Sequence, residues 1–60
     1  MKKNDLIEEF GHQARARLVA AADALQTPND DYAVLEAHKH IHRAQTYIWA
    51  LQTTQELEEE

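Results

Sequence analysis

Four histidines are the residues of this chain best suited to chemistry. Three lie in the stretch His38-Lys39-His40-Ile41-His42, and His12 lies well before them. On an α-helix His38 and His42 are four residues apart and share a face, whereas His40 points away from them. If two helices pair antiparallel so that residue i lies near about 54 minus i, His12 comes level with His42. The three histidines would then form a zinc site.

A metal site is nevertheless not the favoured interpretation. The chain has no H-E-x-x-H arrangement and no EF-hand loop, and histidine pairs on helices often occur without metal. We therefore expect no metal and no cofactor, with His42 at the edge of an interface and His38 and His40 partly solvated. A pH role stays open, because protonation of four histidines would move the net charge from -5 to near -1. A change in charge does not by itself establish a sensor.

The usual catalytic nucleophiles are missing. The sequence has neither cysteine nor serine, and its threonines and lysines stand in no recognisable catalytic setting. A chain of 60 residues also offers little room for a substrate pocket. The sequence therefore predicts a protein that is not an enzyme.

Four basic residues fall near the middle of such a hairpin, at Arg15, Arg17, Lys39 and Arg43. This basic belt would suit an acidic protein surface or RNA, or it would form salt bridges with Glu36 or Asp23. Eleven acidic against six basic residues oppose general attraction to a phosphate backbone. A small RNA- or DNA-binding regulator is thus the alternative hypothesis, and nucleic acid is the less favoured partner.

The elements that position these residues are predicted to be two helices. One glycine and one proline leave almost no material for turns between strands. The sequence Asp5-Leu6-Ile7-Glu8 has the form of a capping box, so the first helix should span about residues 5–26. Thr27-Pro28 should break it and start a second helix over about 28–55, followed by a frayed acidic tail at 56–60. Residues 1–60 thus form one all-α domain, an antiparallel helical hairpin.

Each predicted helix carries an apolar heptad pattern. Spacings of three and four connect two sets of residues: Ile7, Gly11, Ala14, Leu18, Ala21 and Leu25, and Val34, Ala37, Ile41, Ala44, Ile48 and Leu51. Small residues in each set permit close approach, and large residues opposite small ones would interdigitate. These two sets are predicted to form the contact between the helices.

The second helix is too apolar for one partner helix to cover. A further stripe contains Leu35, His42 and Trp49, and the stretch 47–51 is apolar nearly all round. A small domain without disulfides usually gains its missing core by oligomerisation. We therefore expect a homodimer, a four-helix bundle with Ile41, Ile48, Trp49 and Leu51 in its interface. The remaining surface of the second helix, or the acidic tail, would bind an unidentified protein partner.

Other features restrict the compartment. The basic Lys2-Lys3 pair is not followed by an apolar run of signal-peptide length, and no run of about 18 apolar residues occurs. No membrane association is expected, and the absence of cysteine suits a reducing environment. The sequence predicts a cytoplasmic protein.

The hairpin layout resembles the Rop-type hairpin dimers at the level of architecture, with no shared residue motif. The opening Asn4-Asp5-Leu6-Ile7-Glu8-Glu9-Phe10-Gly11, together with the size and helical pattern, resembles small accessory proteins of temperate lambdoid phages, encoded between exonuclease and excisionase genes. This resemblance implies a protein of the infected bacterial cytoplasm that modulates development by binding a host or phage protein. It transfers no functional residue.

Overall fold

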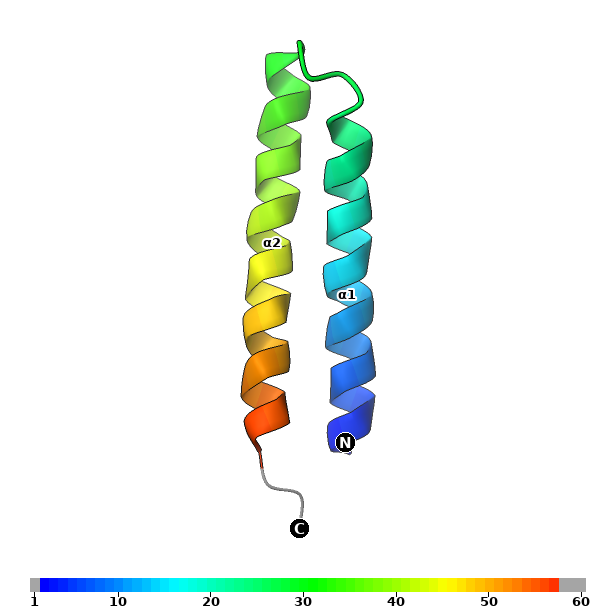
Figure 1. Ribbon diagram of the computed structural model, residues 1–60, viewed down its shortest axis with the longest axis vertical. Helices are drawn as coiled ribbons and strands as arrows, with labels where there is room; N and C mark the ends of the chain where they lie inside the picture. Colours follow the sequence, from blue (N-terminus) through cyan, green and yellow to red (C-terminus); the bar gives the residue numbers. More distant parts are fainter. Residues whose placement is uncertain (1, 58–60) are drawn as a thin grey trace.

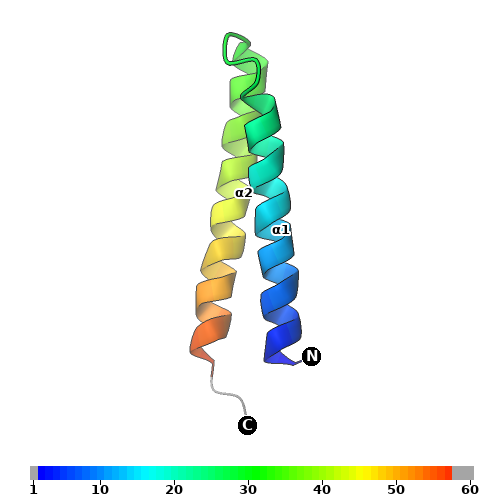
Figure 2. The same ribbon diagram turned by 45° about the vertical axis from the view of Figure 1, so that its right-hand side comes forward.

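The protein is a hairpin of two antiparallel helices in the computed structural model, which describes residues 2–57 (Figure 1). Helix α1 spans Lys3–Ala24 and helix α2 spans Asp31–Glu56. The connecting loop lies at one end, and a second view shows the helices still side by side along their length (Figure 2). The predicted all-α hairpin is confirmed. Residues 58–60 of the predicted acidic tail lie outside the described residues.

The start of α1 differs from the prediction. The helix begins at Lys3, and its N-cap Lys2 makes no side-chain hydrogen bond, so Asp5 lies in the first turn instead of capping it. A carboxylate there still suits the positive end of the helix dipole. The Lys3 ammonium donates two hydrogen bonds to the C-terminal end of α2, to the carbonyl oxygens of Gln55 at 3.0 Å and Leu57 at 2.8 Å. A cation on these last carbonyls of α2 ties the two chain ends together.

The loop is longer than expected, because Thr27-Pro28 does not start α2. Residues 25–30 connect the helices, and Asp30 is the N-cap of α2. Its Oδ1 accepts a hydrogen bond of 2.9 Å from the backbone N–H of Tyr32. Thr27 lies in this loop, and its hydroxyl donates to the carbonyl of Ala24 at the end of α1. An aspartate cap satisfies a free amide better than a threonine that precedes proline, so the helix starts later.

Loss of the Asp30 cap is expected to destabilise the protein. Asp30→Ala removes the acceptor for the Tyr32 amide and should lower the free energy of unfolding by about 1 kcal/mol. Urea denaturation at one fixed protein concentration measures this change. The matched control is Asn29→Ala in the same loop, which should stay within about 0.5 kcal/mol of the parent. Equal effects of the two substitutions would show that the Asp30 carboxylate does not act as a cap.

Alanines form the centre of the contact between the helices. Ala14 and Ala21 of α1 and Ala37 and Ala44 of α2 are buried, and Ala21 and Ala44 are each only 1% exposed. The buried residue nearest the chain ends is Thr54. Alanine side chains let the two backbones approach closely, so this seam is narrow. No large side chain is fully buried among the described residues.

The bulky residues of the predicted contact are divided: Ile7 and Leu51 are partly buried, but Leu18, Leu25, Val34, Ile41 and Ile48 are exposed. Positions adjoining the buried alanines on the inner side of the hairpin hold Phe10, Arg17, His40 and Tyr47, all partly buried. The rings of Phe10 and Tyr47 lie 6.5 Å apart, and Arg17 contacts His40. The register therefore pairs residue i with 57 minus i instead of about 54 minus i. Leu18, Leu25 and Ile41 consequently lie beside the seam and not in it.

Candidate functional site

Five bulky aliphatic side chains remain partly exposed on one side of the hairpin. We call this set the apolar face: Leu18, Leu25, Val34, Ile41 and Ile48, between 36% and 50% exposed. Each would normally be buried in a stable domain. Over the described residues, neither helix has a long enough apolar stretch to cross a membrane. Exposed apolar patches are typical of protein or membrane interaction sites and of ligand-binding grooves.

Helix geometry places the five residues on the same side. Leu18 lies four residues after buried Ala14, and Ile41 lies four residues after buried Ala37. Each is therefore rotated from the seam in the same sense about its own helix axis. Because the helices run antiparallel and face each other, equal rotations bring both side chains to one face of the hairpin. The spacing of seven from Leu18 to Leu25, and from Ile41 to Val34 and Ile48, extends the face along both helices.

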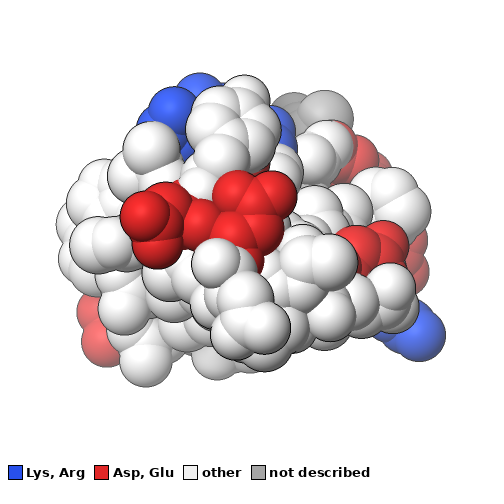
Figure 3. Space-filling model, turned by 90° about the horizontal axis from the view of Figure 1, so that it is seen from above, with Lys and Arg blue, Asp and Glu red and all other residues white. Residues whose placement is uncertain are grey.

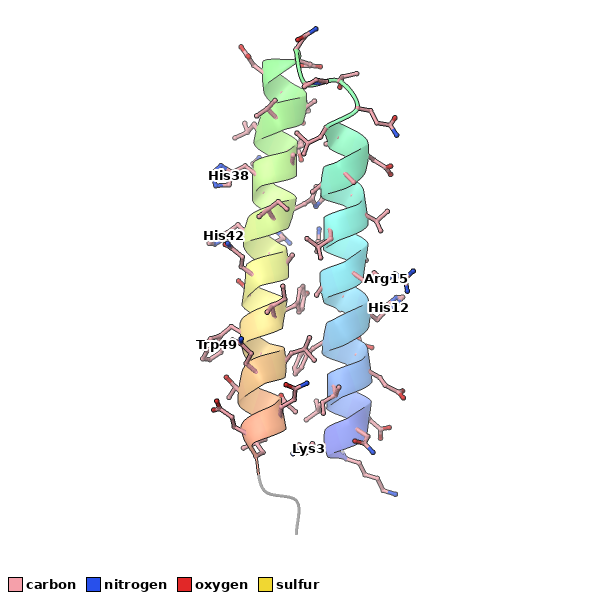
Figure 4. The ribbon with its side chains drawn as sticks, in the orientation of Figure 1. Lys3, His12, Arg15, His38, His42 and Trp49 are labelled. Carbon is pink, nitrogen blue, oxygen red and sulfur yellow. The ribbon has the colours of Figure 1, made fainter. Side chains whose placement is uncertain are left out.

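The structure separates the four residues predicted for the oligomer interface. Ile41 and Ile48 lie on the apolar face, whereas Leu51 is partly buried in the seam of the same hairpin. Trp49 is 66% exposed and projects from the side of α2 turned away from α1 (Figure 4). The sequence missed Leu18 and Leu25 as interface candidates, because their heptad spacing equally suited the contact within the hairpin.

The side of α2 turned away from α1 is a second surface, which we call the outer face of α2. His38, His42 and Trp49 project from it (Figure 4). Leu35, which is half exposed, lies one turn before His38 and two turns before His42. Leu35, His38, Lys39, His42 and Arg43 line a shallow depression there. This surface combines apolar side chains with cationic ones.

The predicted three-histidine arrangement is not assembled within the hairpin. His12 projects from α1 on the side away from α2, opposite to His38 and His42 (Figure 4). The error came from the register and from the helix face, since His12 points outward at any register that buries Ala14. No three histidine or carboxylate groups among the described residues are placed to hold one metal ion.

The four residues of the predicted basic belt do not form one surface. Arg15 projects outward from α1 (Figure 4), whereas Arg17 lies in the seam against His40. Lys39 lies 3.8 Å from the carboxylate of Glu36 in a solvent-exposed pair, and it adjoins Arg43 at the depression on α2. A single stretch of phosphate backbone would not reach all four groups.

Arg17 and His40 are the polar groups that interrupt the seam. The Arg17 Nη1 lies 3.4 Å from His40 Nδ1, which accepts the hydrogen bond only when its proton is on Nε2. A hydrogen bond of this length contributes little, but it occupies a position that apolar side chains could fill. The pair thus sets the register more than it stabilises the hairpin.

Replacing both partners by leucine tests this interpretation. Arg17→Leu combined with His40→Leu should raise the free energy of unfolding by about 1 kcal/mol, because two apolar side chains replace a long hydrogen bond without leaving a polar group unpaired. Thermal and urea denaturation of the double variant measure the change. The single variant Arg17→Leu, which leaves His40 without its partner, is the control and should be less stable than the double variant. A double variant less stable than the parent would show that the polar pair is itself stabilising.

Tyr32 is the titratable group with a displaced pKa. A hydrogen bond from its phenol to the Glu36 carboxylate, with the negative charge of that carboxylate, raises the pKa of Tyr32 above 10.0. Comparison with protein-family models, curated proteins and solved structures finds no match to this chain.

Proposed function

We propose that this chain is a non-enzymatic protein-interaction module that works as a homodimer, in which two hairpins pack through their apolar faces into a four-helix bundle. One observation carries the proposal. The described residues fully bury only alanines and Thr54, while the five bulky residues of the apolar face stay between 36% and 50% exposed. The chain thus has bulky aliphatic side chains that could form a hydrophobic core, but a single hairpin does not bury them.

The energetics favour a second copy as the group that covers this face. Full burial of a Leu, Ile or Val side chain contributes about 1.5 to 3 kcal/mol, and a domain of this size is marginal without such burial. A homodimer with two-fold symmetry covers the same face on both copies at once, and it is the commonest form of soluble oligomer. The polar residues that flank the apolar face, such as Gln45 and Arg15, would then form the rim.

The outer face of α2 supports the second part of the proposal, a separate protein partner. Leu35 and Trp49 directly follow Val34 and Ile48, so they lie about 100° further around α2, at the edge of a dimer contact that buries the apolar face. Trp49 projects away from α1 there (Figure 4). An exposed tryptophan is the residue type most enriched at binding hot spots. Lys39 and Arg43, which line the depression on this face together with Leu35, favour an acidic partner surface. Regulation of a phage or host protein in the bacterial cytoplasm, implied by the resemblance, is compatible with such a module.

The alternative of an RNA- or DNA-binding regulator has less support. The net charge is negative, and the four residues of the basic belt point in different directions from the hairpin. Few phosphates would be neutralised at once, so binding at physiological salt would be weak.

Sedimentation equilibrium combined with tryptophan fluorescence tests the proposal. The purified chain should have twice the monomer mass at micromolar concentration, while the emission of Trp49 stays at long wavelength and is quenched by iodide. A folded monomer would overturn the dimer. A dimer with blue-shifted, protected Trp49 emission would show that the outer face of α2, and not the apolar face, forms the interface.

A further inference from the structure

The depression on the outer face of α2 has the residue spacing that receives a side chain from a second helix. It is lined by Leu35, His38, Lys39, His42 and Arg43. The first four stand at positions i, i+3, i+4 and i+7, which are the corners of the hole that one helix offers to a knob of another. Leu35 is the apolar corner, and the two imidazoles and the Lys39 ammonium can donate hydrogen bonds at the other three. A helix lying along α2 would therefore place a side chain in this hole.

Two threonines continue this face beyond the depression, and their hydroxyl groups are satisfied within α2. The Thr46 hydroxyl donates to the carbonyl of His42 at 3.3 Å, and the Thr53 hydroxyl donates to the carbonyl of Trp49 at 3.0 Å. Neither proton therefore needs water or another molecule as its acceptor. A partner helix can cover the stretch from Leu35 to Thr53 without leaving these hydroxyl protons unpaired.

The middle of α2 has a different charge from the rest of this acidic chain. No Asp or Glu occurs between Glu36 and Glu56, although the chain has eleven acids, and the permanent cations of this stretch are Lys39 and Arg43. The Lys39 ammonium lies 3.8 Å from the Glu36 carboxylate in an exposed pair. Such a pair contributes little, so Lys39 can exchange this carboxylate for one of a partner. The stretch therefore complements carboxylates.

The outward side of α1 has a similar depression but the opposite charge. That depression is lined by His12, Arg15, Ala16 and Val19. The acids of α1 stand three, four, seven and eleven positions from His12 and so share its side of the helix: Asp5, Glu8, Glu9 and Asp23. His12 projects away from α2 (Figure 4), so these carboxylates do not face the depression on α2. An acidic partner is therefore repelled by the outward side of α1 and attracted to the outer face of α2.

Acids at both ends of α2 restrict where the carboxylates of a partner would lie. Acidic atoms gather at the loop end, as the view from that end shows (Figure 3), and Glu56 follows Trp49 by two turns. The cationic stretch 38–43 lies between these acids. Trp49 is about 9 Å beyond Arg43 along the helix, at 1.5 Å per residue. A matching partner has its carboxylates level with 38–43 and an apolar side chain beside Trp49.

We infer that the outer face of α2 binds an acidic amphipathic helix of another protein, with carboxylates on Lys39 and Arg43 and an apolar side chain against Trp49. The inference deepens the proposed function and rests on its second part, a protein partner at this face. The backbone N–H groups of α2 beyond its first turn are bonded within the helix, so a partner contacts side chains alone, as one helix does on another. Trp49, 66% exposed, supplies the apolar anchor of the contact.

Selection from a library of helical peptides tests the inference. The library displays an alanine-rich helix without tryptophan, in which the positions of one face are randomised, and the full chain is the target. Recovered peptides should carry acidic and apolar residues on that face. Added to the free chain, they should shift the emission of Trp49, its single tryptophan, to shorter wavelength. Neutral or basic recovered peptides, or no recovered peptide, would overturn the inference.

Charge reversal identifies the surface that the recovered peptides bind. Arg43→Glu should weaken their binding about tenfold at low salt, and Trp49→Ala should weaken it at least about tenfold. The matched control is Arg15→Glu, which reverses an exposed cation on the outward side of α1 and should change the affinity less than about threefold. Helical circular dichroism checks that each variant is folded. Equal losses for Arg43→Glu and Arg15→Glu would overturn the inference.

Two further measurements separate the acidic helix from other occupants of this face. Duplex DNA should bind at least about tenfold more weakly than the recovered peptides, because two permanent cations neutralise few phosphates. Tighter binding of the duplex, lost in Arg43→Glu, would assign the face to nucleic acid instead. Trp49 already protected from iodide in the free chain would assign it to a second copy.

Sedimentation of the same samples separates this inference from the proposed dimer. A dimer whose peptide binding does not depend on Arg43 and Trp49 would overturn the inference and leave the dimer intact. A monomer that binds acidic peptides through Arg43 and Trp49 would overturn the dimer and support the inference.

Discussion

Replacement of Ile41 by aspartate is expected to dissociate the dimer and unfold the chain together. Ile41 is 36% exposed on the apolar face, and the proposed dimer would enclose it between the two copies. A carboxylate enclosed there without a partner charge costs roughly 3–5 kcal/mol, and the dimer contains two of them. That is comparable to the whole stability of a small domain. The expected result is a monomeric mass with greatly reduced helical circular dichroism.

The matched control is Leu35→Asp on the same helix. Leu35 is 50% exposed and lies on the outer face of α2, so its replacement by aspartate should leave mass and helicity near those of the parent. An acid near the start of α2 also suits the helix dipole. If Leu35→Asp dissociates the dimer and Ile41→Asp does not, the interface lies on the outer face of α2. If neither variant changes the mass, neither surface forms the dimer.

The sequence was sufficient to predict the two helices and their antiparallel pairing. Scarcity of glycine and proline, and the interruption near Thr27-Pro28, leave one long helix on each side of one turn. The exact start of α2 was not predictable from that signal, because both Thr27 and Asp30 are good N-cap residues. The structure uses Asp30, whose carboxylate reaches the Tyr32 amide.

It was harder to predict which side chains pack beside the alanines in the contact between the helices. Two possible sets of positions on α1 differ by a shift of one residue. Ala14 and Ala21 fit a contact with either Phe10 and Arg17 or Gly11 and Leu18 as the intervening residues. A hydrophobicity criterion chooses Leu18, whereas the structure places Arg17 in the seam and Leu18 at its edge. Hydrophobic pattern alone does not distinguish a leucine that packs against the other helix from one that lies at the edge of the seam. The alanines are therefore the residues that mark the contact within the hairpin.

The histidines and basic residues show the same limitation. Their spacing predicted which of them share a helix face, as the common direction of His38 and His42 confirms (Figure 4). It did not predict which face the other helix occupies. Arg15 projects outward and Arg17 lies in the seam, because two residues are about 200° of rotation around the helix. The geometry of a site built from two helices depends on the rotation of each helix about its own axis and on the register between them. The sequence predicted which residues share a helix face, but it did not predict which face packs against the other helix or the exact register.

Enlargement of a seam alanine is expected to be the most damaging change inside the hairpin. Ala44 is 1% exposed and lies between His40 and Tyr47 along the seam, both of which contact α1. Ala44→Leu would force the helices apart at a point where they approach closely, since the seam has no cavity to receive three more carbon atoms. Overpacking of this kind costs about 1–3 kcal/mol. Urea denaturation at fixed protein concentration should show this loss.

The same substitution at Ala16 separates overpacking from other effects. Ala16 is exposed on α1, so Ala16→Leu has nearly the same effect on helix propensity and apolar content without touching the seam. It should change the free energy of unfolding by less than about 0.5 kcal/mol. Equal stability of Ala44→Leu and Ala16→Leu would mean that the helices are not held at alanine contact. A loss confined to Ala44→Leu, with the dimer mass retained, would place the close approach within each hairpin and the larger aliphatic contacts between the two copies.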